Sequence, residues 1–92
     1  MQKSIFTQEY TALRAALRHA REQAGLSQRD LAERLTVPHS WVAKVEVGER
    51  RLDLIETCHF LRACEVDVYA VLHAVAEQCI MRKRPRFRGD GR

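Results

Sequence analysis

The sequence predicts an all-α protein, a compact bundle of five helices with an extended C-terminal helix and a disordered basic tail. Glycine and proline are rare, with four and two among 92 residues. Together with the lack of β-branched runs, this composition favours helices over strands. Apolar residues recur three and four positions apart, which is the spacing of one helix face. We expect an N-terminal arm at 1–7, one helical domain at 8–81 and the tail at 82–92.

The first helix is expected over residues 8–24. Thr7 can cap it, because a threonine hydroxyl can accept a hydrogen bond from a free N–H group of the first turn. Arg14, Arg18 and Arg21 share one face, which is ordinarily a solvated surface. The inner face is formed by Tyr10, Leu13, Leu17, Ala20 and Ala24.

The central stretch, residues 25–48, predicts two short helices joined by a tight turn. The first of them is expected over 28–35. Ser27 is a good N-cap for it, and Asp30 stands near the capping-box position, at the positive end of the helix dipole.

The second short helix is expected over 39–47. Pro38 suits its start, where the fixed φ and the missing N–H cost nothing, and Gly48 ends it. Val42 and Val45 give this helix an inward face. Polar and aromatic side chains therefore point outward, and these are His39, Ser40, Trp41 and Lys44.

Two further helices follow a loop at residues 48–53. Asp53 can cap a helix over 54–64, and Asp67 can cap a long last helix over 68–81. The core face of the helix over 54–64 is expected to contain Ile55, Cys58, Phe60 and Leu61.

The central pattern resembles the helix-turn-helix of the phage repressor and Cro family, often called XRE-like. The matching positions are Gln28, Leu31, Ala32, Leu35, Val37, Val42, Val45, Glu46 and Gly48. The resemblance covers roughly residues 12–72 and implies a five-helix bundle that binds duplex DNA, usually as a dimer. The family usually has Gly where this chain has Thr36 and Glu65. We therefore expect either strained backbone or locally different turns at these two positions.

The resemblance implies that the helix over 39–47 reads base edges in the major groove, where donors and acceptors form a distinguishable pattern. Lys44 can donate to guanine O6 or N7, His39 can donate to a purine acceptor, and Ser40 can donate or accept. Trp41 has two open interpretations. It either contacts a thymine methyl or the sugar-phosphate backbone, or packs over the junction of the two short helices.

Phosphate contacts should hold such a module in register. Gln28 opens a helix whose free N–H groups favour an anion. By family position, Arg50 and Arg51 in the following loop are expected to contact phosphate, and Arg18 is a further candidate. Each of these arginines can also be a solvated side chain.

The resemblance further implies a structural ion pair between Arg21 and Glu46. Such a pair fixes the first helix to the recognition helix. Breaking it by Arg21→Ala would leave a charge without its partner.

One recognition helix reads few base pairs, so useful specificity requires two copies. The expected arrangement is a two-fold dimer on a palindrome, with recognition helices roughly 34 Å apart. The candidate dimer surface is the stripe of Val68, Leu72, Val75 and Cys79 on the last helix. The alternative is that this stripe completes the core of the monomer.

The net charge of +4 is unevenly distributed. The tail at 82–92 carries six basic residues and one acidic residue, so residues 1–81 have a net charge of −1. DNA binding therefore requires a local basic face. The three cysteines, Cys58, Cys64 and Cys79, have no C-x-x-C spacing, so we expect small buried apolar residues and no metal site.

Several classes of protein are not expected. No apolar stretch approaches the roughly 20 residues of a membrane span. The first residues lack the apolar segment of a signal peptide, so a cytoplasmic protein is expected. The sequence has no Gly-rich phosphate loop and no credible nucleophile–base pair, so we expect neither an enzyme nor a cofactor.

The leading hypothesis is a sequence-specific, double-stranded-DNA-binding transcriptional regulator, in the form of a dimeric autorepressor that reads a palindrome. The alternative is an antitoxin or adaptor module whose main role is to bind a protein partner such as a toxin. A long last helix and a basic tail would suit that alternative.

Overall fold

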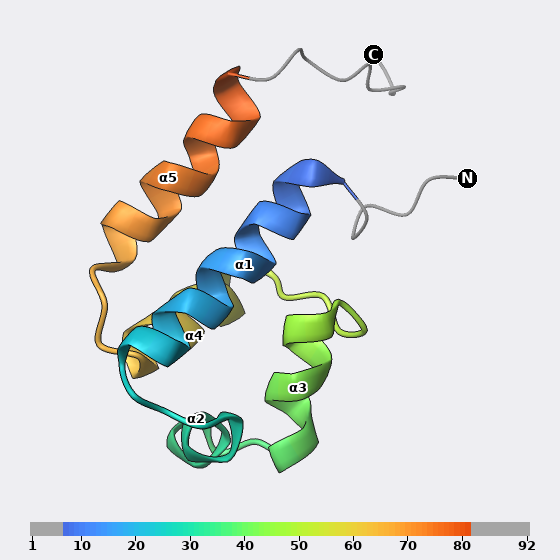
Figure 1. The fold of residues 1–92 in the computed structure, drawn as a ribbon, viewed down its shortest axis with the longest axis vertical. Helices are drawn as coiled ribbons and strands as arrows, with labels where there is room; N and C mark the ends of the chain where they lie inside the picture. The colour runs from blue at the N-terminus through green and yellow to red at the C-terminus, as the bar shows by residue number, and fades with distance from the viewer. Residues whose placement is uncertain (1–6, 82–92) are drawn as a thin grey trace.

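The computed structural model describes residues 7–81 and shows five helices in that range (Figure 1). They are α1 (Gln8–Gln23), α2 (Gln28–Leu35), α3 (His39–Val47), α4 (Leu54–Ala63) and α5 (Val68–Met81). The described range contains no strand, so the predicted all-α class is confirmed. The predicted basic tail and all of the predicted arm except Thr7 lie outside the described residues.

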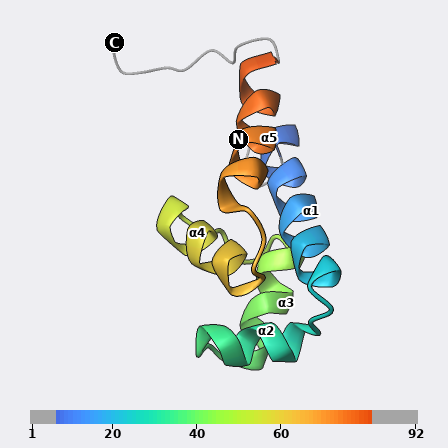
Figure 2. The ribbon, with the colours of Figure 1, turned by 90° about the vertical axis from the view of Figure 1, so that its left-hand side faces the viewer.

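The helices are arranged in two groups (Figures 1 and 2). α1 and α5 run side by side at one end, and α2 and α3 form the helix-turn-helix at the other end. α1 also packs against α3 and α4, while α2 packs against α3 and α4. The recognition helix α3 is therefore held by both α1 and α2.

The core is built by the first four helices. Its largest fully buried side chains are Leu17 from α1, Leu31 from α2, Val42 and Val45 from α3, and Phe60, Leu61 and Cys64 from α4 and its end. Full burial of one such aliphatic or aromatic side chain contributes roughly 1.5–3 kcal/mol. α5 has no fully buried residue and covers the core with Val68, Val71 and Leu72. It is a covering helix.

All four predicted N-caps are present. The Thr7 hydroxyl accepts from an N–H of the first turn of α1 over 3.1 Å. Ser27 and Asp53 both form complete capping boxes. Asp67 accepts from an N–H in the first turn of α5 over 3.2 Å. Hydrogen bonds from Ser27 lower the pKa of the Asp30 carboxyl below its usual value, because they stabilise the ionised form.

The two positions where the family usually has glycine keep the left-handed conformation. Thr36 has φ 59° and ψ 48°, and Glu65 has φ 59°. The left-handed region costs an ordinary residue roughly 1–2 kcal/mol. The Val37 N–H then donates to the Ala32 carbonyl over 3.0 Å, which satisfies an end group of α2. Of the two expectations, the strained backbone is correct.

The predicted core face of α4 is partly wrong. Ile55 is 64% exposed and Cys58 is only half-buried. The buried face instead includes Thr57, whose hydroxyl donates to the Asp53 carbonyl over 2.7 Å. A polar residue can be buried here because its hydrogen bond is made locally, which apolar periodicity does not reveal.

Two further residues are exposed where burial is predicted. Ala24 follows the last residue of α1 as its C-cap, so it does not extend the inner face. Cys79 lies near the end of α5, where residues 76–81 are all exposed. Cys64 is buried, and burial raises the pKa of its thiol to about 11. The expectation of buried apolar cysteines therefore holds for Cys64 only.

Candidate nucleic-acid interface

The recognition helix α3 has one buried side and one exposed side. Val42 and Val45 are fully buried, whereas His39, Ser40 and Lys44 are exposed. This separation follows from placing apolar residues three positions apart on a helix. The exposed side chains all carry hydrogen-bond donors, so α3 presents a short row of donors to solvent.

The carboxylate of Glu46 connects α3 to the two preceding helices. Arg21 donates to it twice, from Nε over 2.6 Å and from Nη2 over 3.1 Å. Gln28, the first residue of α2, donates its side-chain amide to the same carboxylate over 3.0 Å. The Arg21 and Glu46 side chains are 10% and 4% exposed, and their hydrogen bond raises the pKa of Arg21. The position of α3 is therefore fixed at its carboxyl-terminal end.

Arg14 is a second arginine at this end, and sequence reasoning assigned it no role. Its Nη1 donates to the backbone carbonyl of Glu46 over 3.1 Å, while its Nε is buried and makes no hydrogen bond within residues 7–81. Gly48 adopts φ 90°, and a Cβ there would lie 3.3 Å from the Arg14 guanidinium. The end of α3 therefore favours glycine for both conformation and space.

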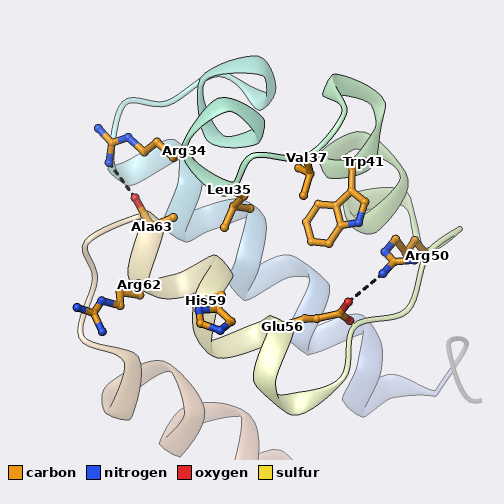
Figure 3. Close-up of a pocket in the computed structure, with 9 residues that line it drawn as sticks. All are labelled: Arg34, Leu35, Val37, Trp41, Arg50, Glu56, His59, Arg62 and Ala63. Carbon is orange, nitrogen blue, oxygen red and sulfur yellow. Dashed lines mark hydrogen bonds and ion pairs between the residues drawn. The ribbon is translucent and has the colours of Figure 1, made fainter.

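Trp41 lies at the other end of α3 and points toward α4 (Figure 3). The guanidinium carbon of Arg50 lies 5.3 Å from the centre of its ring. Arg50 Nη2 also donates to Glu56 Oε2 over 2.9 Å. Trp41 is half-buried and packs against the core. Its geometry corresponds to the packing interpretation, with α4 as an additional neighbour.

Two hollows border Trp41. The first, here called the α4 groove, has a volume of about 640 Å³ and an apolar floor that includes Leu35, Val37 and Ala63 (Figure 3). The second, here called the α3 cleft, has a volume of about 430 Å³. The α3 cleft is lined by Pro38, Ser40, Trp41, Lys44, Glu49, Arg50 and Arg51. It brings three of the predicted base-reading residues and both predicted loop arginines to one place.

The loop after α3 is tied to α1 through Tyr10. The guanidinium carbon of Arg51 lies 4.8 Å from the centre of the Tyr10 ring. The Tyr10 hydroxyl accepts from the backbone N–H of Leu52 over 3.1 Å. Arg51 is therefore held at the surface by a buried aromatic residue, and its side chain remains exposed.

Two further predicted contact residues have partners within the chain. Arg18 Nε donates to Glu22 over 3.1 Å, and both side chains are exposed. Arg29 Nε donates to His39 Nδ1 over 3.3 Å, so a neutral His39 imidazole carries its proton on Nε2. The Lys44 amine makes no hydrogen bond or ion pair with any other residue of the described range.

The predicted dimer stripe is divided between two environments. Val68 and Leu72 are half-buried and pack against the core of the same chain. Val75 is half-buried and Cys79 is exposed. The first half of the stripe thus completes the monomer, whereas Val75 and Cys79 do not belong to its core.

Neither a metal site nor a membrane-spanning helix occurs among the described residues. Among residues 7–81, no group of three or more His, Cys, Asp or Glu side chains is arranged to hold a metal ion. In the same range, no helix is both long enough and apolar enough to cross a membrane.

The chain is similar to a known domain family and to a solved structure. The family model described as "Helix-turn-helix domain" matches residues 12–77. A solved structure, described as an XRE-family like protein from Pseudomonas syringae pv. tomato str. DC3000, is 43% identical in sequence. The superposition has a TM-score of 0.75 and covers 82% of this chain and 92% of that chain.

Proposed function

This chain belongs to the XRE-like helix-turn-helix family, and on that premise we propose that it is a sequence-specific transcriptional regulator that binds duplex DNA. In the proposed form it is a cytoplasmic homodimer that represses transcription, including that of its own gene, by binding a palindrome. The observation that carries the proposal is the donor row on α3, formed by His39, Ser40 and Lys44 on a helix fixed through Glu46.

The chemistry of this row suits base edges in the major groove. Lys44 can donate to guanine O6 or N7, and a neutral His39 can donate from Nε2 to a purine acceptor. Arg29 favours this tautomer of His39, because Arg29 Nε donates a hydrogen bond to Nδ1 and the ring proton is then on Nε2. Ser40 discriminates less, because a hydroxyl can donate or accept. We therefore assign the largest share of base discrimination to His39 and Lys44.

Phosphate contacts are proposed on both sides of α3. Arg50 and Arg51 lie in the loop that borders the α3 cleft. On the other side, the backbone N–H groups at the start of α2 near Gln28 can receive a phosphate, while the side-chain amide of Gln28 remains on Glu46. Arg18 is the remaining candidate, and it would have to leave Glu22.

The proposed dimer uses the last half of the α5 stripe. Val75→Glu should give monomers, because it places a charge at a half-buried apolar position that lies outside the core of the chain. Size-exclusion chromatography with light scattering measures this directly, and circular dichroism checks that the variant remains folded. A folded Val75→Glu dimer would place the interface elsewhere.

Selection of bound duplexes from a random DNA pool at roughly physiological salt tests the function, because non-specific phosphate binding is weak there. We expect enrichment of a palindrome with half-sites about one helical turn apart. His39→Ala and Lys44→Ala should change the preferred bases. Failure to enrich any sequence would contradict sequence-specific binding.

The alternative is an antitoxin or adaptor that mainly binds a protein. The α4 groove supports this alternative, because its floor is apolar and it is open to solvent. Isolation of the protein from its native cells with one stoichiometric partner, together with no enrichment from the DNA pool, would favour this role over the first.

A further inference from the structure

The Arg50 side chain is engaged on two sides in the free protein. One face of its guanidinium lies over the Trp41 ring, at 5.3 Å from the ring centre. One edge donates to Glu56 Oε2 over 2.9 Å (Figure 3). Arg50 is therefore held between α3 and α4, at the boundary of the α3 cleft and the α4 groove.

Glu56 is itself fixed by the start of α4. Its Oε1 accepts from the backbone N–H of Asp53 over 3.0 Å, and its backbone N–H donates to Asp53 over 2.7 Å. This capping box leaves Oε2 as the oxygen that faces Arg50. The carboxylate is therefore held at a defined place in the free protein.

A carboxylate and a phosphate bind a guanidinium in the same way, through charge-assisted hydrogen bonds along its edges. The edge that Glu56 occupies is not free for a phosphate at the same time. The Arg50 and Glu56 side chains are 42% and 34% exposed, so their ion pair is weak enough to exchange.

We propose that Glu56 is an intramolecular competitor of DNA phosphate for Arg50. In the free protein Glu56 holds the guanidinium against the Trp41 ring, and on DNA a phosphate that enters the α3 cleft takes its place. The inference rests on the proposed DNA-binding function. Trp41 is a positioning residue in it, since its ring supports Arg50 in both states.

The test is Glu56→Gln, which keeps the capping-box acceptor and removes the negative charge. Removal of any negative charge near DNA strengthens binding, so a matched control is needed. Glu49→Gln supplies it, because Glu49 lines the α3 cleft as Arg50 does, and among the described residues Arg50 forms its ion pair with Glu56 and not with Glu49. Thermal unfolding of each variant checks that the fold is retained.

Affinity is measured on a random-sequence duplex at low salt, because phosphate contacts do not depend on sequence. We expect Glu56→Gln to bind about threefold more tightly than Glu49→Gln, the size of effect that an exposed ion pair allows. In an Arg50→Gln background, the difference between the two glutamate variants should vanish. Equal affinities in the native background, or an equal difference in the Arg50→Gln background, would overturn the proposal.

A second readout does not use DNA. Trp41 is the only tryptophan among the 92 residues, so fluorescence excited selectively at tryptophan reports its surroundings alone. Glu56→Gln and Arg50→Gln should change its emission in the same direction, and Glu49→Gln should leave it unchanged. No change in either variant would overturn the contact itself. If fluorescence shows the contact of Arg50 with Trp41 and Glu56, but neither the native protein nor any variant binds duplex DNA, the proposed DNA-binding function is wrong. The proposed competition with phosphate is then wrong as well.

Discussion

Two arginine–glutamate pairs lie beside α3, and they differ in burial. The side chains of Arg21 and Glu46 are 10% and 4% exposed, and Glu46 also accepts from Gln28. The side chains of Arg50 and Glu56 are 42% and 34% exposed, and Arg50 has an aromatic ring as its other neighbour. The same pair of residue types therefore occurs once in a closed network and once at an open boundary.

The difference shows how burial assigns a role to an ion pair. Removal of one partner from a buried pair leaves a charge that water cannot solvate, which costs several kcal/mol. Removal of one partner from an exposed pair costs little, because water and salt replace it. The buried Arg21–Glu46 pair can therefore fix α3 permanently, while Arg50 can exchange Glu56 for another partner.

The strongest way to test this contrast is Arg21→Ala. It should lower the free energy of unfolding by about 3–5 kcal/mol, because the Glu46 carboxylate stays buried with only Gln28 as a side-chain donor. Chemical denaturation followed by circular dichroism measures the loss. Arg18→Ala is the matched control on α1, since its ion pair with Glu22 is exposed and should contribute under about 1 kcal/mol.

If Arg21→Ala does not fold, Arg21→Lys can be used instead, because it keeps the charge and removes the bidentate hydrogen bond to Glu46. A double-mutant cycle with Glu46→Gln then gives the coupling between the two positions. Additive effects of the two substitutions would show that the pair does not fix α1 to α3.

A smaller effect is expected at the glycine that follows α3. Gly48→Ala should destabilise the fold by about 1–3 kcal/mol, because φ is 90° and the added Cβ meets the Arg14 guanidinium at 3.3 Å. Gly25→Ala is the control, since Gly25 has φ 74° with open space around it. Thermal unfolding of both variants separates the conformational cost from the crowding. Equal losses would mean that Arg14 moves away without cost.

The sequence was sufficient for the helices and their caps, because these depend on local chemistry. The caps at Thr7, Ser27, Asp53 and Asp67 could be found because each needs only a short polar side chain before an apolar run. The contact between Arg21 and Glu46 was inferred from the family resemblance, since 25 residues separate the two partners and no local pattern joins them.

The contacts of Arg50 and Trp41 were less accessible to sequence reasoning. The Asp53-x-x-Glu56 spacing is a capping-box signal, yet it does not reveal that the second Glu56 oxygen meets Arg50. The direction of Trp41 depends on the angle between α3 and α4, which periodicity does not contain. The prediction that Ile55 is buried was wrong for a similar reason, because only the packing of α4 against its neighbours decides which of two adjacent helix faces is buried.

The smallest expected change in stability is at the open pair. Arg50→Gln should alter the free energy of unfolding by less than about 0.5 kcal/mol, because both side chains are partly solvated. Its effect should appear in DNA binding instead, where the slope of log affinity against log salt should fall by about one unit if Arg50 contacts a phosphate. Arg34→Gln is the control, since Arg34 pairs with Glu65 at another part of the α4 groove and lies outside the α3 cleft. An unchanged slope in Arg50→Gln together with a large loss of stability would reverse the contrast, and Arg50 would then be structural like Arg21.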